Sequence, residues 1–249
     1  MFRVSHVNID NLDLYMRLKQ STTFEHITRG RQGAILVDPV DGHVPIVRTT
    51  TAYEQQAQKF SPIHYEIIAS IRAQFADIPQ LTFNNAMIEI YDSSYRKMRF
   101  HTDQALDLED DSFICLFSCY KNADTAHFRT LKIKNKSSQE CWSIDLTHNS
   151  AVLFSTRANS EHVHKIVLDS NNDCGDWLGI TFRLSKTYID YTDHVPTIVG
   201  IGKLLRMATS DEVDEFRKHK SLENKTIGKY SYPDIGYTIS MSDKLQMRD

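Results

Sequence analysis

The chain has 249 residues, of which 41% are hydrophobic and 24% are charged, and its formal net charge is −3. This composition is typical of a globular protein with one generous domain, and it excludes collagen-like and low-complexity chains. The near-neutral charge provides no global basic field, which counts against nucleic acid as a partner without excluding it. No segment approaches the roughly 18 apolar residues of a membrane span, and we expect a cytoplasmic protein with no membrane contact.

Residues 1–80 are expected to form a mixed α/β flank. The segment 61–75 starts with a Ser-Pro pair and places isoleucines at helical spacing, which predicts an amphipathic helix. Before it, residues 32–39 and 43–51 are expected to be short strands or extended loops on either side of an Asp-Gly turn signal.

Residues 81–190 contain short runs rich in β-branched and aromatic residues, separated by polar turns. The runs leave no room for crossover helices, which predicts antiparallel pairing in a sandwich or jelly roll. The expected strands cover residues 86–94, 96–103, 112–120, 127–135, 139–146, 150–156, 162–169 and 177–185.

Residues 191–249 are expected to be an extension of the same domain, which then spans 1–249. Thr209 and Glu212 form a capping-box pattern that predicts a helix through about Lys220. The expected fold class is therefore mainly β with flanking α: a jelly-roll core with an N-terminal helix and a C-terminal helical extension.

A His-x-acidic pattern occurs twice, at His101 and Asp103 and at His64 and Glu66. In a helix, residues i and i+2 point about 200° apart, so His64 and Glu66 cannot bind one ion. In a strand they face the same side, so His101 and Asp103 can chelate one ion. A second histidine would complete a 2-His-1-carboxylate set, which holds one face of Fe(II) and leaves other positions open.

Two histidines qualify as the second one, His162 and His164. They are i and i+2 in a predicted strand, so the alternation of the strand does not choose between them. We prefer His164 because it begins the regular apolar run HKIVL, whereas His162 follows the polar segment TRANSE. His162 stays open as the alternative.

Arg183 and Ser185 share one face of the predicted strand 177–185. A guanidinium offers a two-pronged fork to a carboxylate, and a hydroxyl adds a further hydrogen bond to the same group. The pair therefore indicates a carboxylate-binding site. The alternative is a half-exposed strand whose polar face contacts water.

The order HxD…H…RxS on a strand-rich core resembles the Fe(II)/2-oxoglutarate-dependent dioxygenases, which share a double-stranded β-helix (jelly-roll) core. Within that superfamily, IEIYDSSYRKMRFHTD and GITFR look most like the AlkB-like branch. The resemblance implies Fe(II) on His101, Asp103 and His164. It also implies that the far carboxylate of 2-oxoglutarate binds Arg183 and Ser185. The enzyme would use O₂ to hydroxylate or oxidatively demethylate a substrate C–H, releasing succinate and CO₂.

The AlkB-like pattern further implies that Tyr91 donates a hydrogen bond to 2-oxoglutarate. This chain departs from the pattern at three positions: it has Trp177 in place of an Arg, and Gly179 and Glu89 in place of Asn. These departures weaken an assignment to nucleic-acid repair more than the assignment of the co-substrate, because Arg183 and its neighbouring serine remain.

Signals for the substrate are few. The polar segment 47–53 precedes the predicted helix, and we expect Arg48 and Thr50 to line a substrate pocket. The leading interpretation is a dioxygenase that acts on a small molecule. One alternative is an AlkB-like demethylase of nucleic acid or protein, and another is a non-enzymatic, cupin-like binding module. The sequence predicts no oligomeric state.

Overall fold

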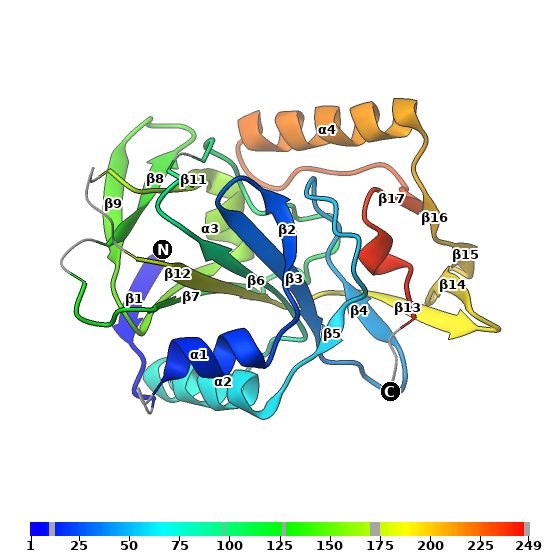
Figure 1. Cartoon of the computed structure of the whole chain (residues 1–249). Coiled ribbons are helices and arrows are strands. Elements are labelled where there is room, and N and C mark those ends of the chain that lie inside the picture. The colour runs from blue at the N-terminus through cyan, green and yellow to red at the C-terminus, as the bar shows by residue number, and fades with distance from the viewer. Residues whose placement is uncertain (10–12, 97, 126–127, 170–174, 247–249) are drawn as a thin grey trace.

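Two β-sheets stacked face to face form the centre of the structure, a computed structural model that describes residues 1–9, 13–96, 98–125, 128–169 and 175–246. The larger sheet has the order β1-β10-β7-β12-β6-β3-β2, with β5 paired to β3, and the smaller sheet has the order β11-β8-β9 (Figure 1). Every pairing in these two sheets is antiparallel except that of β3 with β5. This arrangement confirms the predicted jelly roll.

The strands of the larger sheet are β1 (Phe2–His6), β2 (Glu25–Thr28), β3 (Arg31–Val37), β5 (Gln58–Lys59), β6 (Asn85–Tyr91), β7 (Phe113–Tyr120), β10 (Ser150–Ser155) and β12 (Trp177–Arg183). Those of the smaller sheet are β8 (Arg129–Asn135), β9 (Cys141–Leu146) and β11 (His162–Val167). A short helix, α3 (Thr156–Glu161), joins β10 to β11.

The larger sheet is buried on both faces, which explains why β7 is apolar at nearly every position. Alternate side chains of a strand point to opposite faces. Cys115 and Phe117 pack toward α1 (Leu14–Gln20) and α2 (Pro62–Gln74), which lie side by side across that face (Figure 1). Leu116 packs toward the smaller sheet. The space between the two sheets is therefore a second, separate core.

The C-terminal region continues the same body. The strands β4 (Val44–Ile46), β13 (Thr187–Thr192), β14 (Val195–Ile198) and β15 (Lys203–Leu204) form a further sheet, and β16 (Arg206–Met207) pairs with β17 (Tyr237–Thr238). Helix α4 (Ser210–Lys225) lies across the opposite side of the molecule from α1 and α2 (Figure 1), and a 3-10 turn covers Met241–Asp243. Among the described helices, none combines the length and apolar character needed to cross a membrane.

Most of the predicted elements are present. Seven of the expected strands correspond to β6 through β12, although the first residue of the segment 127–135 lies outside the described residues. The capping box is confirmed, since the backbone N–H of Thr209 donates to Oε2 of Glu212 at 2.9 Å, and α4 continues past Lys220.

Two expectations about elements need correction. The predicted strand over 96–103 is wrong: residues 98–100 have no regular structure, and His101 forms only an isolated bridge. The segment 1–80 is not merely a flank, because it supplies β1, β2, β3 and β5 to the larger sheet. Both errors arise because pairing with distant strands, rather than local composition, decides which segments join a sheet.

Helix α2 begins with a buried histidine in its capping box. The backbone N–H of Ser61 donates to Nδ1 of His64 at 2.9 Å, so Nε2 carries the proton of the ring. Nε2 is buried and has no hydrogen-bond partner among the described residues. Burial lowers the pKa of His64 to about 4, which keeps the imidazole neutral in the folded protein.

Acid should therefore destabilise the protein through His64. Its pKa is near 6.5 in an unfolded chain and about 4 in the folded one, so protonation favours unfolding. The contribution is complete above pH 6.5 and is lost as the pH falls toward 4, by up to about 3 kcal/mol. The glutamine of His64→Gln does not titrate, and its side-chain oxygen can also accept the N–H of Ser61. Between neutral and acidic pH, the free energy of unfolding measured in urea should therefore fall less in this variant than in the unaltered protein. An equal fall in both proteins would contradict this assignment.

Candidate metal centre

Three side chains that could hold a metal ion meet between the two sheets: His101, Asp103 and His164. One ligand atom from each lies within 4.8 Å of the others. Nε2 of His164 is 3.5 Å from Oδ1 of Asp103, and the centroids of the two imidazole rings are 4.8 Å apart. In the part of the chain that the structure describes, no other group of three such side chains gathers.

Backbone pairing brings the two histidines together. The N–H of His101 donates to the carbonyl oxygen of His164 at 2.9 Å, and the N–H of His164 donates back at 2.7 Å. His101 therefore extends the smaller sheet by one residue, next to β11. Nδ1 of His101 is 3.0 Å from the carbonyl oxygen of Arg99. Because a carbonyl can only accept, Nδ1 carries the proton and Nε2 is left to bind an ion.

The structure brings His164, and not His162, to this cluster. Nδ1 of His162 lies 2.8 Å from the carbonyl oxygen of Ala158, and its Nε2 lies 3.1 Å from Nδ2 of Asn135. Both ring nitrogens of His162 therefore have partners elsewhere. The reason is local: His162 directly follows α3, and its ring caps the carbonyl end of that helix.

Asp103 is kept charged although it is buried. Nε of Arg183 donates to Oδ2 of Asp103 at 2.9 Å. Burial alone would raise the pKa of Asp103, but Arg183, and after it His164, hold this pKa well below its usual range. Burial, and then the neighbouring His164, lower the pKa of His101 to about 3. At neutral pH Asp103 is thus a carboxylate and His101 a neutral imidazole, the forms that bind metal.

Two cavities border the cluster, and both are lined by Asp103 and Arg183. The inner cavity lies between the sheets and is mostly apolar, with walls from Tyr91, Leu116, Leu131, Phe154 and Ile166. The outer cavity, of about 230 Å³, has polar and charged side chains in its wall, among them Arg31, Thr49, Thr50, Thr51, Gln104 and Lys220. Thr50 therefore lines a cavity next to the candidate metal ligands.

Glu89 is a buried carboxylate in the wall that the two cavities share, and it is fully paired. Nε of Arg31 donates to its Oε1 at 2.7 Å, and the hydroxyl of Tyr53 donates to the same oxygen at 3.2 Å. The hydroxyl of Tyr91 donates to Oε2 at 2.5 Å. Tyr91, the expected donor to 2-oxoglutarate, lines the inner cavity, but its hydroxyl donates to Glu89 and not into the cavity.

Ser185 does not lie beside Arg183, which corrects the expected pair. Strand β12 ends at Arg183, so the alternation that would place the two side chains on one face ends there. The hydroxyl of Ser185 donates to the carbonyl oxygen of Ile46 at 2.5 Å, outside both cavities. Of Arg183 and Ser185, only Arg183 lies where it can bind a ligand near the metal site.

Arg48 is also placed elsewhere than expected. It is buried and lines neither cavity. Its Nη2 donates to Oδ1 of Asp107 at 2.7 Å and its Nε to Oδ2 at 3.0 Å, while Nη1 donates to the carbonyl oxygens of Ile235 and Tyr237. The guanidinium therefore joins the C-terminal region to the segment that follows the metal ligands, and it is not available to a substrate.

Several residues of the site escaped the sequence analysis, notably Arg31, Asn159 and Lys220. Arg31 and Lys220 lie far along the chain from the histidines, whereas Asn159 lies only five residues before His164 and hydrogen-bonds the backbone of Asp103. None of the three carries a motif of its own. One signal was present for Lys220: in the helix that the capping box predicts, it lies four residues after the apolar Phe216 and so shares its inward face.

Replacing the second histidine should separate the two candidates. His164→Ala should weaken the binding of Mn(II) to the metal-free protein by more than about 100-fold, because a direct ligand is lost. His162→Ala is the matched control and should bind Mn(II) as the unaltered protein does. Isothermal titration calorimetry measures both dissociation constants. Loss of binding in His162→Ala alone would overturn the assignment.

Removing Arg48 should destabilise the protein without a direct effect on a bound substrate. Arg48→Met leaves the charge of Asp107 buried and unpaired, which should cost roughly 3–5 kcal/mol in the free energy of unfolding. Urea denaturation measures this loss, and the double variant with Asp107→Leu should recover part of it. A variant of unchanged stability would contradict the structural role.

Comparison with known proteins supports the fold. No family model matches the sequence, and no curated protein matches it. Among solved structures, OsALKBH1, an AlkB-like protein, is 13% identical over 73% of this chain and 97% of its own, with a TM-score of 0.52. A prolyl-4-hydroxylase from Pseudomonas putida is 12% identical over 74% of this chain and 92% of its own, with a TM-score of 0.44. The likeness to OsALKBH1 agrees with the jelly-roll fold seen here, and the described residues add a His-Asp-His cluster inside it.

Proposed function

We propose that the protein is an Fe(II)- and 2-oxoglutarate-dependent dioxygenase that oxidises a C–H bond of a small-molecule substrate. The observation that carries the proposal is the cluster of His101, Asp103 and His164 inside the jelly roll, with Arg183 hydrogen-bonded to the carboxylate. Two imidazoles and one carboxylate are the donor set that holds Fe(II) on one face and leaves open positions for other ligands.

The residues present fit such an ion. The proton of His101 lies on Nδ1, which leaves Nε2 as a donor atom for an ion, and Nδ1 of His164 is buried without a partner among the described residues. Asp103 carries a charge that an ion would neutralise. His101, Asp103 and His164 would hold the ion. When bound, Fe(II) supplies the one-electron and O₂ chemistry that amino-acid side chains do not provide.

Arg183 is the residue proposed to bind a carboxylate of 2-oxoglutarate. Of the described residues that line the inner cavity, it alone carries a permanent positive charge. Among the described residues, Asp103 is its hydrogen-bond partner and contacts Nε, so both Nη nitrogens are left for a carboxylate, which Arg binds with two parallel hydrogen bonds. The hydrogen bond from Nε to Asp103 orients the guanidinium for this contact.

The departures from the AlkB-like pattern support Arg183 as the principal cation. Trp177 stands where the pattern has its other arginine, and its ring packs against Tyr91, with centroids 4.9 Å apart. The ring also lies over Gly179, where any added Cβ would overlap it. This end of the cavity is thus filled by an aromatic core. Glu89, paired with Arg31, leaves no uncompensated negative charge to repel 2-oxoglutarate.

The outer cavity is proposed to hold the substrate. It adjoins His101 and Asp103, and its volume of about 230 Å³ suits a small molecule rather than a folded partner. The wall offers hydroxyl groups from Thr49, Thr50 and Thr51. Such groups bind polar atoms of a small metabolite. Whether the oxidised carbon is retained as an alcohol or lost in a demethylation is decided by the substrate.

Binding of 2-oxoglutarate tests the proposal. Under anaerobic conditions the protein with Fe(II) should develop a visible charge-transfer band when 2-oxoglutarate is added. Arg183→Met removes charge-assisted hydrogen bonds worth about 1.5–3 kcal/mol, so the dissociation constant of 2-oxoglutarate should rise by roughly 10- to 100-fold.

The matched control is Ser185→Ala, which alters the neighbouring hydroxyl outside the cavities and should bind 2-oxoglutarate normally. Because Arg183 also pairs with Asp103, the affinity for Mn(II) is measured in the same variants, which separates loss of co-substrate from loss of metal. A folded, metal-binding protein that gave no band and released no succinate with any substrate pool would refute the proposed reaction.

A further inference from the structure

The C-terminal helix α4 contacts the loop that carries two of the three candidate metal ligands. Oδ1 of Asn224 accepts hydrogen bonds from the backbone N–H of Thr102 at 2.9 Å and from its hydroxyl at 3.1 Å. Nζ of Lys220 donates to the carbonyl oxygen of Thr102. Oε1 of Glu223 accepts from the N–H of Ala105 at 2.9 Å. Thr102 is the middle residue of the HxD motif, so α4 holds the backbone of the motif itself.

These side chains replace the support that a sheet would give. Between its bridges at His101 and Leu108, the loop belongs to no strand. The N–H of Asp103 instead donates to Oδ1 of Asn159 in α3, and Nδ2 of Asn159 donates back to the carbonyl oxygen of Asp103, both at 2.8 Å. The position of the ligands thus depends on acceptors supplied by α3 and α4.

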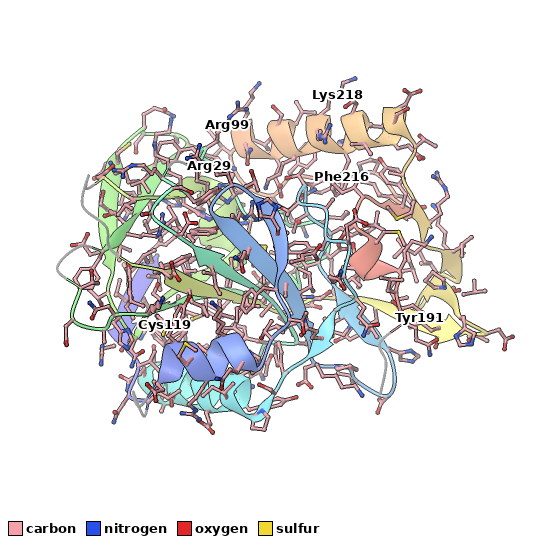
Figure 2. All side chains as sticks on the ribbon, in the orientation of Figure 1. Arg29, Arg99, Cys119, Tyr191, Phe216 and Lys218 are labelled. Atoms are coloured by element: carbon pink, nitrogen blue, oxygen red, sulfur yellow. The ribbon has the colours of Figure 1, made fainter. Side chains whose placement is uncertain are left out.

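Helix α4 docks mainly through polar contacts. Of its residues only Phe216 and Glu223 are buried, and Lys218 extends from the outer side of the helix while Phe216 lies on the side facing the body of the protein (Figure 2). Nζ of Lys220 is 3.2 Å from Oε2 of Glu223, which also accepts from the hydroxyl of Tyr232 at 2.8 Å. The inward face of α4 therefore consists largely of groups aimed at the loop, in contrast to the apolar faces of α1 and α2.

We propose that α4 positions the metal ligands, with Asn224 and Lys220 as positioning residues, so that metal affinity is coupled to the docking of this helix. The inference rests on the proposed metal site. Coupling between two binding events is reciprocal: if docked α4 strengthens metal binding, bound metal strengthens the docking of α4 by the same factor. Lys220 also lines the outer cavity, so docking of the helix completes a wall of the proposed substrate pocket.

The first test is the affinity of the full-length protein for Mn(II), measured by calorimetry. Asn224→Ala should weaken binding by roughly 10-fold or more, the size of effect seen when groups that orient a metal ligand are removed. Asn224→Asp keeps an oxygen acceptor for the N–H and hydroxyl of Thr102 and should restore most of the affinity. Lys218→Ala, on the exposed side of the same helix, is the matched control and should bind Mn(II) as the unaltered protein does.

The second test is amide hydrogen exchange in residues 210–225. Addition of Mn(II) should slow exchange across α4 in the unaltered protein, and by less in Asn224→Ala. Thr102→Val, which removes the hydroxyl contacts and keeps the shape of the side chain, should weaken Mn(II) binding even if Asn224→Ala fails to fold. Unchanged affinity in folded Asn224→Ala or Thr102→Val, or exchange in α4 that does not respond to Mn(II), would overturn the coupling. An unaltered protein that binds no Mn(II) would instead refute the metal site on which the coupling rests.

Discussion

A carboxylate buried between two sheets keeps its charge only where a positive group lies against it, and Asp103 depends on Arg183 for this. The hydrogen bond from Nε of Arg183 to Oδ2 of Asp103 joins the last residue of β12 to a loop that no strand contains. Because a metal ligand must be deprotonated, this one contact sets the state in which the cluster can bind an ion. It also orients the guanidinium toward the inner cavity, where we propose that 2-oxoglutarate binds.

The loop around Asp103 gains its order from segments that are remote in the chain. Asn159 of α3 binds both the N–H and the carbonyl of Asp103, while Arg48 holds Asp107 and two carbonyl groups of the C-terminal region. Helix α4 adds the contacts of Asn224 to Thr102. Phe216 is the one buried apolar side chain of α4, so this helix contributes little to the core, and several of its polar groups contact the loop of the proposed site.

At the three positions where this chain departs from the AlkB-like pattern, neighbouring residues accommodate the different side chains. Glu89 introduces a negative charge beside the proposed co-substrate, but Arg31, Tyr53 and Tyr91 bind it from three directions. Trp177 replaces a cation with a ring, and the absence of a side chain at Gly179 makes room for that ring. The inner cavity is mostly apolar, and Arg183 is the permanently charged cation among its described lining residues.

Local patterns in the sequence determined the secondary structure and the types of ligand. Runs rich in β-branched and aromatic residues identify β6 to β12, the helical spacing of isoleucines identifies α2, and a capping box identifies α4, because each of these signals is local in the chain. The HxD motif, the later histidine and Arg183 identified the candidate cluster, since few arrangements of residues bind Fe(II) with one face open.

Tertiary structure decided what local patterns could not. The choice of His164 over His162 follows from the partners that α3 and Asn135 supply to His162, and strand alternation treats both alike. Ser185 leaves the site because β12 ends two residues earlier, and Arg48 leaves it because Asp107, far along the chain, binds it. Lys220 and Asn224 enter the site through the docking of α4. A hydrogen bond between residues about a hundred positions apart leaves no repeating pattern in the sequence, so the sequence does not predict it. In the folded chain, the backbone nitrogen of Thr102 and Oδ1 of Asn224 lie 2.9 Å apart.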